Sequence, residues 1–280
     1  MTVFIQQVVN GLTFAGVYGL IAIGISLVFG MTGIINFAQG DLLMVGAYVA
    51  LFVALKTDIV LGIVAAAIAL TLLGILLYRG LFDWVRSSPI SGFIISIGLI
   101  SVLENGMTEI ASSNDRAYAS GMTSFSIAGV RLITSNVIVL AVTAVAATAL
   151  LLVYSKTDFG RVVRVCVEDR DTAELLGISV RRVNTLVLGL SGAFAGAGGG
   201  LLLLLYPINP YTGSTLIFSA FTAALIGGLT KVQGAVVGAL AVGLLTSMND
   251  QYGPTAWTQL LVYVLLVVVL LIRPSGIFGT

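Results

Sequence analysis

Charged residues are scarce in this chain. Only 9% of its 280 residues are Asp, Glu, Lys or Arg, and 58% are hydrophobic, whereas an average soluble domain carries about 25% charged residues. Several charge-free stretches reach the roughly 20 apolar residues that a helix needs to cross a bilayer. They cover residues 1–40, 59–78, 87–103, 132–155 and 183–230. This composition excludes a water-soluble surface and predicts a protein that crosses the membrane several times.

Histidine is absent, and cysteine occurs once, at Cys166. These absences exclude a disulfide within the chain, Cys/His zinc sites and histidine acid–base chemistry. The net charge is only +1 and the basic residues form no stripe, which excludes nucleic acid as a partner. The chain also lacks the G-x-x-x-x-G-K-[ST] phosphate loop. We therefore predict no catalytic residue, no metal and no cofactor bound by this chain, and we expect Cys166 to be an inert thiol.

Nine hydrophobic segments result when charge, glycine, proline and asparagine are taken as breaks. They lie near residues 8–29, 38–55, 59–78, 89–110, 134–154, 183–205, 214–229, 232–249 and 256–272. The pair 214–229 and 232–249 is short, with glycines around its turn, and is compatible with a re-entrant hairpin. The sequence predicts an all-α, polytopic transmembrane bundle of about eight or nine membrane segments, forming one domain over residues 1–280.

The basic residues predict an orientation, because short loops rich in Lys and Arg stay in the cytoplasm. If the loop 155–182 is cytoplasmic, ten of the 13 Lys and Arg residues lie inside. Only Lys56, Arg116 and Arg131 then lie outside. The N-terminus is thus expected outside, the C-terminus in the cytoplasm, and the polar stretch 111–133 on the external face. Because the first seven residues carry no Lys or Arg, we interpret the first segment as a permanent span rather than a signal peptide.

The loop 155–182 holds 11 of the 25 formal charges. Within it, Asp171-Thr-Ala-Glu174 has the pattern of a capping box, with Asp171 as the predicted N-cap. Leu175 and Leu176 follow, and Gly177 can end the helix. Two interpretations are open for this short helix with an apolar side. It is either a solvated connector whose arginines lie at the lipid headgroups or a helix that docks into a groove on a cytoplasmic protein.

Several motifs resemble one family of membrane proteins. Gly160-Arg161-Val-Val-Arg164 and Glu168-Asp-Arg-Asp-Thr-Ala-Glu174-Leu-Leu-Gly177 resemble the cytoplasmic loop of LivH-type permeases. These permeases belong to branched-chain amino acid ABC importers, and some branches carry urea and short amides. Matches extend in order from about residue 11 to 279 and include Gly33-Ile-Ile-Asn36-Phe37-Ala38-Gln39-Gly40-Asp41. The family has histidine where this chain has Gln39, which removes a titratable group at that position.

The resemblance implies a transport subunit, not an enzyme, in a bacterial or archaeal cell (inner) membrane. Its implied partners are a second related permease, two cytoplasmic ATPase subunits that bind ATP and Mg, an extracytoplasmic substrate-binding protein and the membrane lipid. The implied cargo is an amino acid of the branched-chain type, or a related small polar solute such as urea or an amide, moved by alternating access. The implied ATPase-coupling residues are Arg161, Arg164, Glu168, Asp169, Asp171, Glu174, Leu175, Leu176 and Gly177.

Polar residues inside the predicted spans are candidates for the translocation path, because such groups usually face a cavity or a partner. They are Asn36, Gln39, Asp41, Glu104 and Asn105. Other interpretations are open: Asn36 can cap the following helix, and Glu104 can pair internally or reach the external headgroups. In a competing function, a self-sufficient channel or ion-coupled carrier would use Glu104 as its titrating group. A third class, a membrane-embedded enzyme, lacks the expected ligands and nucleophiles.

Glycines recur every fourth residue in two of the predicted spans. They are Gly192, Gly196 and Gly200 in one span, and Gly234 and Gly238 in the other. Small residues on one helix face let two helices approach closely. We expect these glycines to mediate packing, either within the chain or against the second permease.

Overall fold

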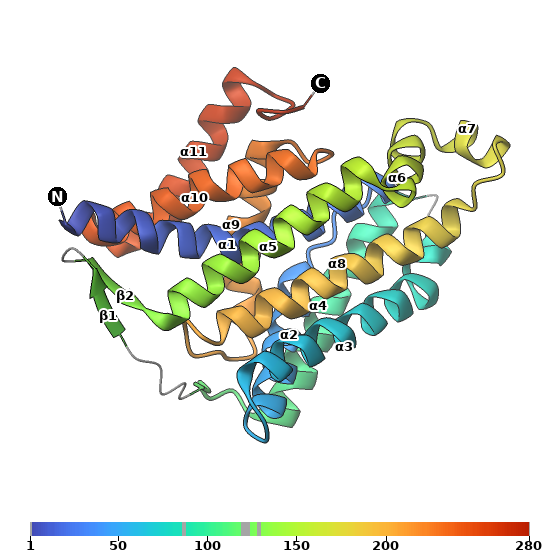
Figure 1. Ribbon diagram of the computed structural model, residues 1–280. Coiled ribbons are helices and arrows are strands. Elements are labelled where there is room, and N and C mark those ends of the chain that lie inside the picture. The colour runs from blue at the N-terminus through green and yellow to red at the C-terminus, as the bar shows by residue number, and fades with distance from the viewer. Residues whose placement is uncertain (1, 86–87, 119–123, 128–129, 280) are drawn as a thin grey trace.

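The computed structural model describes residues 2–85, 88–118, 124–127 and 130–279, and helices dominate it (Figure 1). Its α-helices are α1 (Thr2–Thr32), α2 (Gln39–Ala54), α3 (Ile59–Gly80), α4 (Pro89–Ala111), α5 (Thr134–Lys156), α6 (Asp158–Glu168), α7 (Arg170–Leu175), α8 (Val180–Leu202), α9 (Thr212–Gly227), α10 (Val232–Tyr252) and α11 (Thr258–Ile272). Two 3₁₀ turns, η1 (Phe82–Val85) and η2 (Thr255–Trp257), and a hairpin of β1 (Ser124–Ile127) and β2 (Val130–Ile133) complete it.

Each of the nine predicted segments corresponds to a helix, so the prediction of a polytopic helical bundle is confirmed. Seven helical spans of the described chain are long and apolar enough to cross a membrane, and the last of them, Thr255–Ile272, consists of η2 and α11 together. The other two apolar helices, α2 and α9, have 16 residues each. The expectation that 214–229 and 232–249 are both short was therefore only half right. The second of them, α10, has 21 residues, and the other short helix is α2.

The central helices form two groups of three. In one, α8 packs against α2 and α3, and in the other α1 packs against α9 and α10. The two groups contact each other mainly through α1 and α8. The glycines explain the close approach. A Cβ atom at Gly196 would lie 2.6 Å from the carbonyl carbon of Ala66 on α3, and one at Gly200 would lie 2.7 Å from Ile63 Cγ1. At Gly196 no side chain fits without moving a helix, and at Gly200 the Ile63 side chain would have to shift.

The remaining glycine positions also lie at contacts within the chain. Gly192 faces the backbone of Leu70 on α3. Gly234 and Gly238 face the backbone of α9 at Gly227 and Ala223. Of the two alternatives for these glycines, the structure places all five at contacts between helices of this chain.

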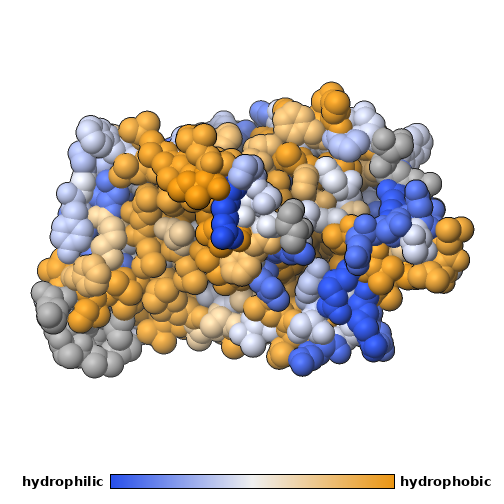
Figure 2. Space-filling view, turned by 90° about the horizontal axis from the view of Figure 1, so that it is seen from above, coloured by the Kyte–Doolittle hydropathy of each residue, from blue (hydrophilic) through white to orange (hydrophobic). Residues whose placement is uncertain are grey.

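The helices α4, α5 and α11 lie at the periphery and expose apolar side chains. Only 17% of an apolar 18-residue window is buried in α4, and likewise in α5, and only 6% is buried in the span Thr255–Ile272 that η2 and α11 form. Hydrophobic residues cover much of the visible surface in Figure 2. Because lipid rather than water contacts such a surface, exposed apolar helices with internally bonded backbones are what a bilayer requires.

The two ends of the bundle differ in content. At one end, called here the hairpin end, lie the N-terminus and the β1–β2 hairpin, and α6 and α7 lie at the opposite loop end (Figure 1). The C-terminal segment joins the turn after α9, where Ile277 N donates to Ile226 O at 2.8 Å. The sequence predicted the stretch 111–133 at the same end as the N-terminus and the loop 155–182 at the other. Of these segments, the described strands β1 and β2 lie at the hairpin end and α6 and α7 at the loop end (Figure 1), and the side of the membrane that each end faces stays a prediction.

Candidate functional site

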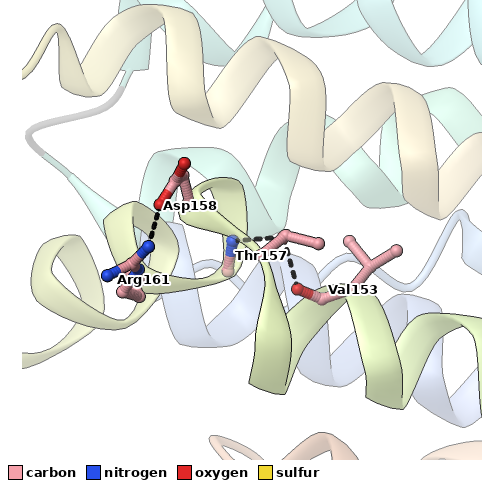
Figure 3. A network of polar contacts seen from close by, with 5 residues as sticks. Val153, Thr157, Asp158 and Arg161 are labelled. Atoms are coloured by element: carbon pink, nitrogen blue, oxygen red, sulfur yellow. Dashed lines mark hydrogen bonds and ion pairs between the residues drawn. The ribbon is translucent and has the colours of Figure 1, made fainter.

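The loop end contains one helix that the sequence analysis did not anticipate. It expected a single short helix in the loop 155–182, but α6 occupies residues 158–168. Thr157 caps α6: its Oγ1 accepts from Gly160 N at 3.1 Å and donates to Val153 O at 2.6 Å (Figure 3). Asp158 and Arg161 form an ion pair on its exposed side (Figure 3). Threonine before an acidic residue was the available signal, since both favour a helix N-terminus.

Arg164 fixes α6 against the end of α5. Its guanidinium donates to the Tyr154 carbonyl and lies 5.4 Å from the centre of the Tyr154 ring. The opposite face of α6 is apolar, with Val163 and Cys166 buried. Burial raises the pKa of the Cys166 thiol, so this thiol stays protonated and unreactive at neutral pH. We conclude that α6 is a fixed support and not a loose connector.

The predicted N-cap of α7 was wrong by two residues. Asp169, not Asp171, caps this helix: its carboxylate accepts from Asp171 N at 3.0 Å and Thr172 N at 3.1 Å. The Thr172 hydroxyl donates to the same carboxylate at 2.5 Å. These bonds hold the pKa of Asp169 below its usual value. Asp171 instead lies in the first helical turn, where its charge suits the helix dipole.

α7 presents leucines to solvent. Ala173 is buried, whereas Leu175 is 88% exposed and Leu176 is 69% exposed. Gly177 ends the helix with φ of +79°, a conformation that favours glycine. Hydrophilic residues gather around this end of the molecule (Figure 2). Two exposed leucines within a charged surface suit contact with another protein better than contact with water or lipid.

Charged side chains brace α7. Arg170 Nε lies 3.6 Å from Glu174 Oε1, one turn along the same helix. Beyond α7, Arg181 at the start of α8 forms an ion pair of 2.7 Å with Asp83 of η1. Glu168 is the last residue of α6, directly before the cap. The nine predicted coupling residues thus occupy α6, α7 and the turn after each of them.

Three of the predicted path residues gather at the start of α2, and all three are buried. Asn36 Oδ1 accepts from Ala38 N at 3.1 Å and stabilises the turn before α2, but Asn36 is not the N-cap, because Ala38 occupies that position. Gln39 joins α2 to α8: its Nε2 donates to Ser191 O at 3.2 Å, and its Oε1 accepts from Ser191 Oγ at 3.1 Å. Both ends of the Gln39 amide are therefore engaged in helix contacts.

Asp41 lies where two short helices meet. It belongs to the first turn of α2, and a Cβ atom at Gly213 in the first turn of α9 would lie 2.6 Å from Asp41 Oδ1. The Asp41 carboxylate is fully buried, and neither oxygen has a hydrogen-bond partner. Helix N-termini carry partial positive charge, so the first turns of α2 and α9 favour a negative charge at this position.

Glu104 and Asn105 lie on the peripheral helix α4. Glu104 is partly exposed and lies within electrostatic range of Asp41. Asn105 is exposed, and its Nδ2 donates to Ser101 O at 2.7 Å within the same helix. Glu104 is thus placed near the start of α2. A role in the path stays a prediction for all five residues.

Sequence reasoning missed a cavity of about 480 Å³ at the hairpin end. Residues of α1, α9 and α10 line it together with Tyr206 in the turn after α8. A usable signal was present, since Phe14 and Tyr18, and Thr246 and Asp250, are spaced four residues apart within apolar segments. Such pairs lie on one helix face, and polar members of a span usually face a cavity.

The long apolar helices and the two short helices that meet inside the bundle define a polytopic helical membrane protein. The model of the family described as "branched-chain amino acid transport system / permease component" matches residues 7–270. The chain therefore belongs to this family of transport permeases.

Individual relatives are similar over nearly their whole length. The high-affinity branched-chain amino acid transport system permease protein LivH of Escherichia coli (strain K12) is 33% identical, over 99% of this chain and 96% of the relative. BraD of Pseudomonas aeruginosa, with the same description, is 32% identical over 99% and 96%. A probable branched-chain amino acid transport permease, LivH of Methanocaldococcus jannaschii, is 30% identical over 93% and 88%. No solved structure matches the chain significantly.

Proposed function

We propose that this chain is the permease subunit of an ABC importer for branched-chain amino acids or related small polar solutes. Separate ATPase subunits drive it, a second permease completes the pore, and an external binding protein delivers the substrate. The observation that carries the proposal is α7, a capped helix with two exposed leucines on a fixed support. The family membership and the names of the relatives support the transport role and the substrate class.

In this proposal, α7 inserts into a groove on an ATPase subunit. ATP and Mg bind to that subunit, and closure of the two ATPases moves α7. The movement passes to α8, which begins five residues after α7 ends. The cavities of the permease pair then open alternately to the two sides of the membrane.

The orientation belongs to this proposal as well. The loop end, with α6 and α7, faces the cytoplasm, and the hairpin end faces outward. Labelling of single cysteines in a Cys166→Ser background tests it, because Ser113 and Glu174 are exposed at opposite ends. In intact cells, an impermeant maleimide is expected to label Ser113→Cys and not Glu174→Cys. The reverse pattern would contradict the proposed orientation.

Substitution of the two α7 leucines tests the docking role. Burial of a leucine side chain stabilises a contact by about 1.5–3 kcal/mol, so Leu175→Ala with Leu176→Ala should weaken ATPase binding by roughly 100-fold or more. We expect ATPase subunits to be lost from the purified complex and ATP-driven uptake in liposomes to stop, at a normal yield of the permease.

Leu271→Ala is the matched control, because this leucine of α11 is 79% exposed but lies outside α7. It should leave the complex and the uptake unchanged. Full uptake by the α7 double variant, or ATP-independent uptake by this chain alone, would refute the importer proposal. The second of these results would instead favour the self-sufficient carrier.

A further inference from the structure

Helix α4 is attached to the rest of the described chain mainly by one face. That face packs against α2 and η1. Two contacts with Phe37 hold it near the start of α2: the Phe93 ring centre lies 5.6 Å from that of Phe37, and Ser96 Oγ accepts from Phe37 N at 3.3 Å. The buried residues of α4 are Gly92, Ser96, Leu99, Met107 and Ala111. Most of the surface of this 23-residue helix therefore has no partner in the part of the chain that the structure describes.

The face of α4 that is turned away from the bundle carries small and polar residues. Gly98, Ser101, Asn105 and Glu109 are all exposed and recur every three or four residues. Because an α-helix has 3.6 residues per turn, these four residues lie on one side of α4 and the buried residues lie on the other. We call the four residues the α4 stripe. When lipid is the only neighbour of a span, polar side chains are expected on the inner face of the span, and α4 has the reverse arrangement.

The α4 stripe lies at the depth of the hydrocarbon layer. At 1.5 Å per residue α4 is about 34 Å long, close to the roughly 30 Å of the hydrocarbon core. Ser101 then lies about 2 Å from the middle of the helix, and Asn105 about 8 Å from it. Asn105 Nδ2 donates to Ser101 O at 2.7 Å, but no described residue donates to Asn105 Oδ1. Glu109 lies in the last turn of α4, where headgroups and water solvate its charge.

Two other peripheral helices of the same chain have the outward face that lipid favours. The large exposed residues of α3 are all aliphatic and recur every three or four residues: Leu61, Val64, Ile68, Leu72 and Leu76. On α11 the exposed aliphatic residues are Leu260, Val264, Val267, Val268 and Leu271. Neither set contains a glycine or an amide. The contrast within one chain indicates that the α4 stripe contacts something other than lipid.

The glycines of α4 lead to the same conclusion. A Cβ atom at Gly98, or at the exposed Gly106, would have no atom of the described chain within 4 Å. Glycine lowers helix propensity, and no close approach within the chain accounts for these two. In a membrane, small residues let a second helix approach closely, and amide side chains form hydrogen bonds between helices. Glycine and asparagine together on one exposed face therefore predict a helix of another protein.

We propose that the α4 stripe is the surface that packs against the second permease of the complex. A transmembrane helix of that subunit places small residues against Gly98 and donates a hydrogen bond to Asn105 Oδ1. The inference rests on the proposed function and assigns a surface to one of its partners. Glu104 precedes Asn105 and lies within electrostatic range of the buried Asp41. The interface thus borders the predicted path residues, as a pore between two permeases requires.

Depth in the membrane selects this partner among those of the proposed complex. The ATPase subunits and the external binding protein work in water, on the two sides of the bilayer. The centre of the α4 stripe lies inside the hydrocarbon layer, so neither of these partners reaches it. The second permease is the member of the proposed complex that spans the membrane beside this chain.

Photo-cross-linking of the assembled complex in its native membrane tests the surface. The photoreactive residue p-benzoylphenylalanine replaces Val102, which lies beside the stripe and is 67% exposed. The matched controls carry it at Leu72 of α3, 63% exposed, and at Val267 of α11, 56% exposed. All three positions lie within about 4 Å of the middle of their helices. After illumination, mass spectrometry should find the second permease attached at Val102 and only lipid attached at the two controls.

Substitutions in the stripe test its contribution to pairing. The amount of second permease that copurifies with this chain is measured after dilution in mild detergent. Asn105→Leu removes the hydrogen bond and should weaken the pairing by about 3- to 30-fold. Gly98→Leu should separate the two permeases and leave this chain folded, because the chain has no atom within 4 Å of a Cβ there. Gly80→Leu, at an equally open position that ends α3, is the matched control and should retain the second permease.

The outcomes separate this inference from the proposed function. Lipid alone attached at Val102, or the second permease attached equally well at Leu72 or Val267, would overturn the α4 surface. Full retention of the second permease by both Asn105→Leu and Gly98→Leu would overturn it as well. In each of these cases the wild-type complex still contains two permeases, and the proposed function stands. A wild-type complex that drives ATP-dependent uptake without any second permease would instead refute that part of the proposed function.

Discussion

Gly196 lies where α8 passes between α2 and α3, and its replacement by alanine is the sharpest test of the packing. A Cβ atom there would lie 2.6 Å from the Ala66 carbonyl carbon and 2.9 Å from Ala67 Cα, both backbone atoms of α3. On the other side, a Cβ atom at Gly46 of α2 would lie 2.7 Å from Gly196 Cα. Because backbone on both sides blocks an escape, Gly196→Ala must push α3 and α8 apart.

The loss of stability expected for Gly196→Ala follows from the short range of dispersion forces. An atom pair at optimal separation contributes about 0.1–0.2 kcal/mol, a buried leucine makes roughly 40 such contacts, and a small gap removes about a quarter of the attraction. One interface side chain of that size then loses about 1–2 kcal/mol. The total agrees with the about 1–3 kcal/mol measured for overpacked cores. Alanine also has a higher helix propensity than glycine, by about 1 kcal/mol, and this gain partly offsets the destabilisation caused by the clash.

Gly98→Ala on α4 removes that ambiguity, because no atom lies within 4 Å of a Cβ at that position. Both variants gain helix propensity, so their difference in unfolding free energy isolates the helix contact. We expect Gly196→Ala to be less stable than Gly98→Ala by about 1–3 kcal/mol in reversible unfolding from mixed micelles. Gly196→Leu should prevent recovery of a monodisperse protein. Equal stability of the two alanine variants would refute the packing argument.

Two further predictions concern charged groups. Because the cap bonds lower the pKa of Asp169, its stabilisation of α7 is complete above the ordinary aspartate pKa of about 3.9 and is lost as pH falls through the lower pKa of the folded state. Hydrogen-exchange protection of α7 should therefore drop on acidification below pH of about 4, and at neutral pH in the Asp169→Ala variant. Unaltered protection in that variant would contradict the cap. Glu104→Gln removes the negative charge that repels the buried Asp41, so the unfolding midpoint of the variant should rise slightly. The uptake rate and selectivity of the same variant, compared with wild type, test whether Glu104 lies on the translocation path. Unchanged rate and selectivity would exclude Glu104 from the path.

Periodicity and charge were enough to predict the helical bundle but not its broken helices. The segment 38–55 is as apolar as a full span, yet α2 begins at Gln39 inside the bundle, where buried side chains bind its first turn. Hydropathy measures the preference for a nonpolar environment, and it does not report how deep a helix begins. The contact between Asp41 and α9 links residues about 170 positions apart, which no local pattern contains.

The cytoplasmic-type loop 155–182 and the cavity at the hairpin end were likewise predictable only in part. The exposed leucines of α7 were predictable because two leucines next to six charged neighbours stand out in a polar segment. The cap was misplaced because Asp169 and Asp171 are both suitable cap residues, and the choice depends on where α6 ends. The cavity needs four helices and a turn from distant parts of the chain. In the sequence, each of its residues taken alone is therefore indistinguishable from an interface aromatic or a polar group at a helix end.

The division of the core into two helix groups gives a mechanical prediction. α8 extends from the turn after α7 at the loop end to Leu202, which lines the cavity at the hairpin end. At 1.5 Å per residue its 23 residues span about 34 Å, so movement of α7 would shift the group of α2, α3 and α8 against the group of α1, α9 and α10. Tyr206 would then move relative to Phe14, and the cavity would open or close.

Two engineered disulfides with equal Cβ–Cβ distances test this movement in a Cys166→Ser background. A Cβ at Gly198 on α8 would lie 3.5 Å from Leu20 Cβ on α1, and a Cβ at Gly19 on α1 would lie 3.5 Å from Ala239 Cβ on α10. Both distances fall in the range of about 3.5–4.5 Å that a disulfide requires. Oxidation of Leu20→Cys with Gly198→Cys joins the two groups and should abolish ATP-driven uptake until reductant is added. Oxidation of Gly19→Cys with Ala239→Cys joins helices of one group and should leave uptake intact. If the first cross-link forms fully and uptake continues at the rate of the reduced protein, α8 does not move against α1, and the coupling from α7 must follow another route.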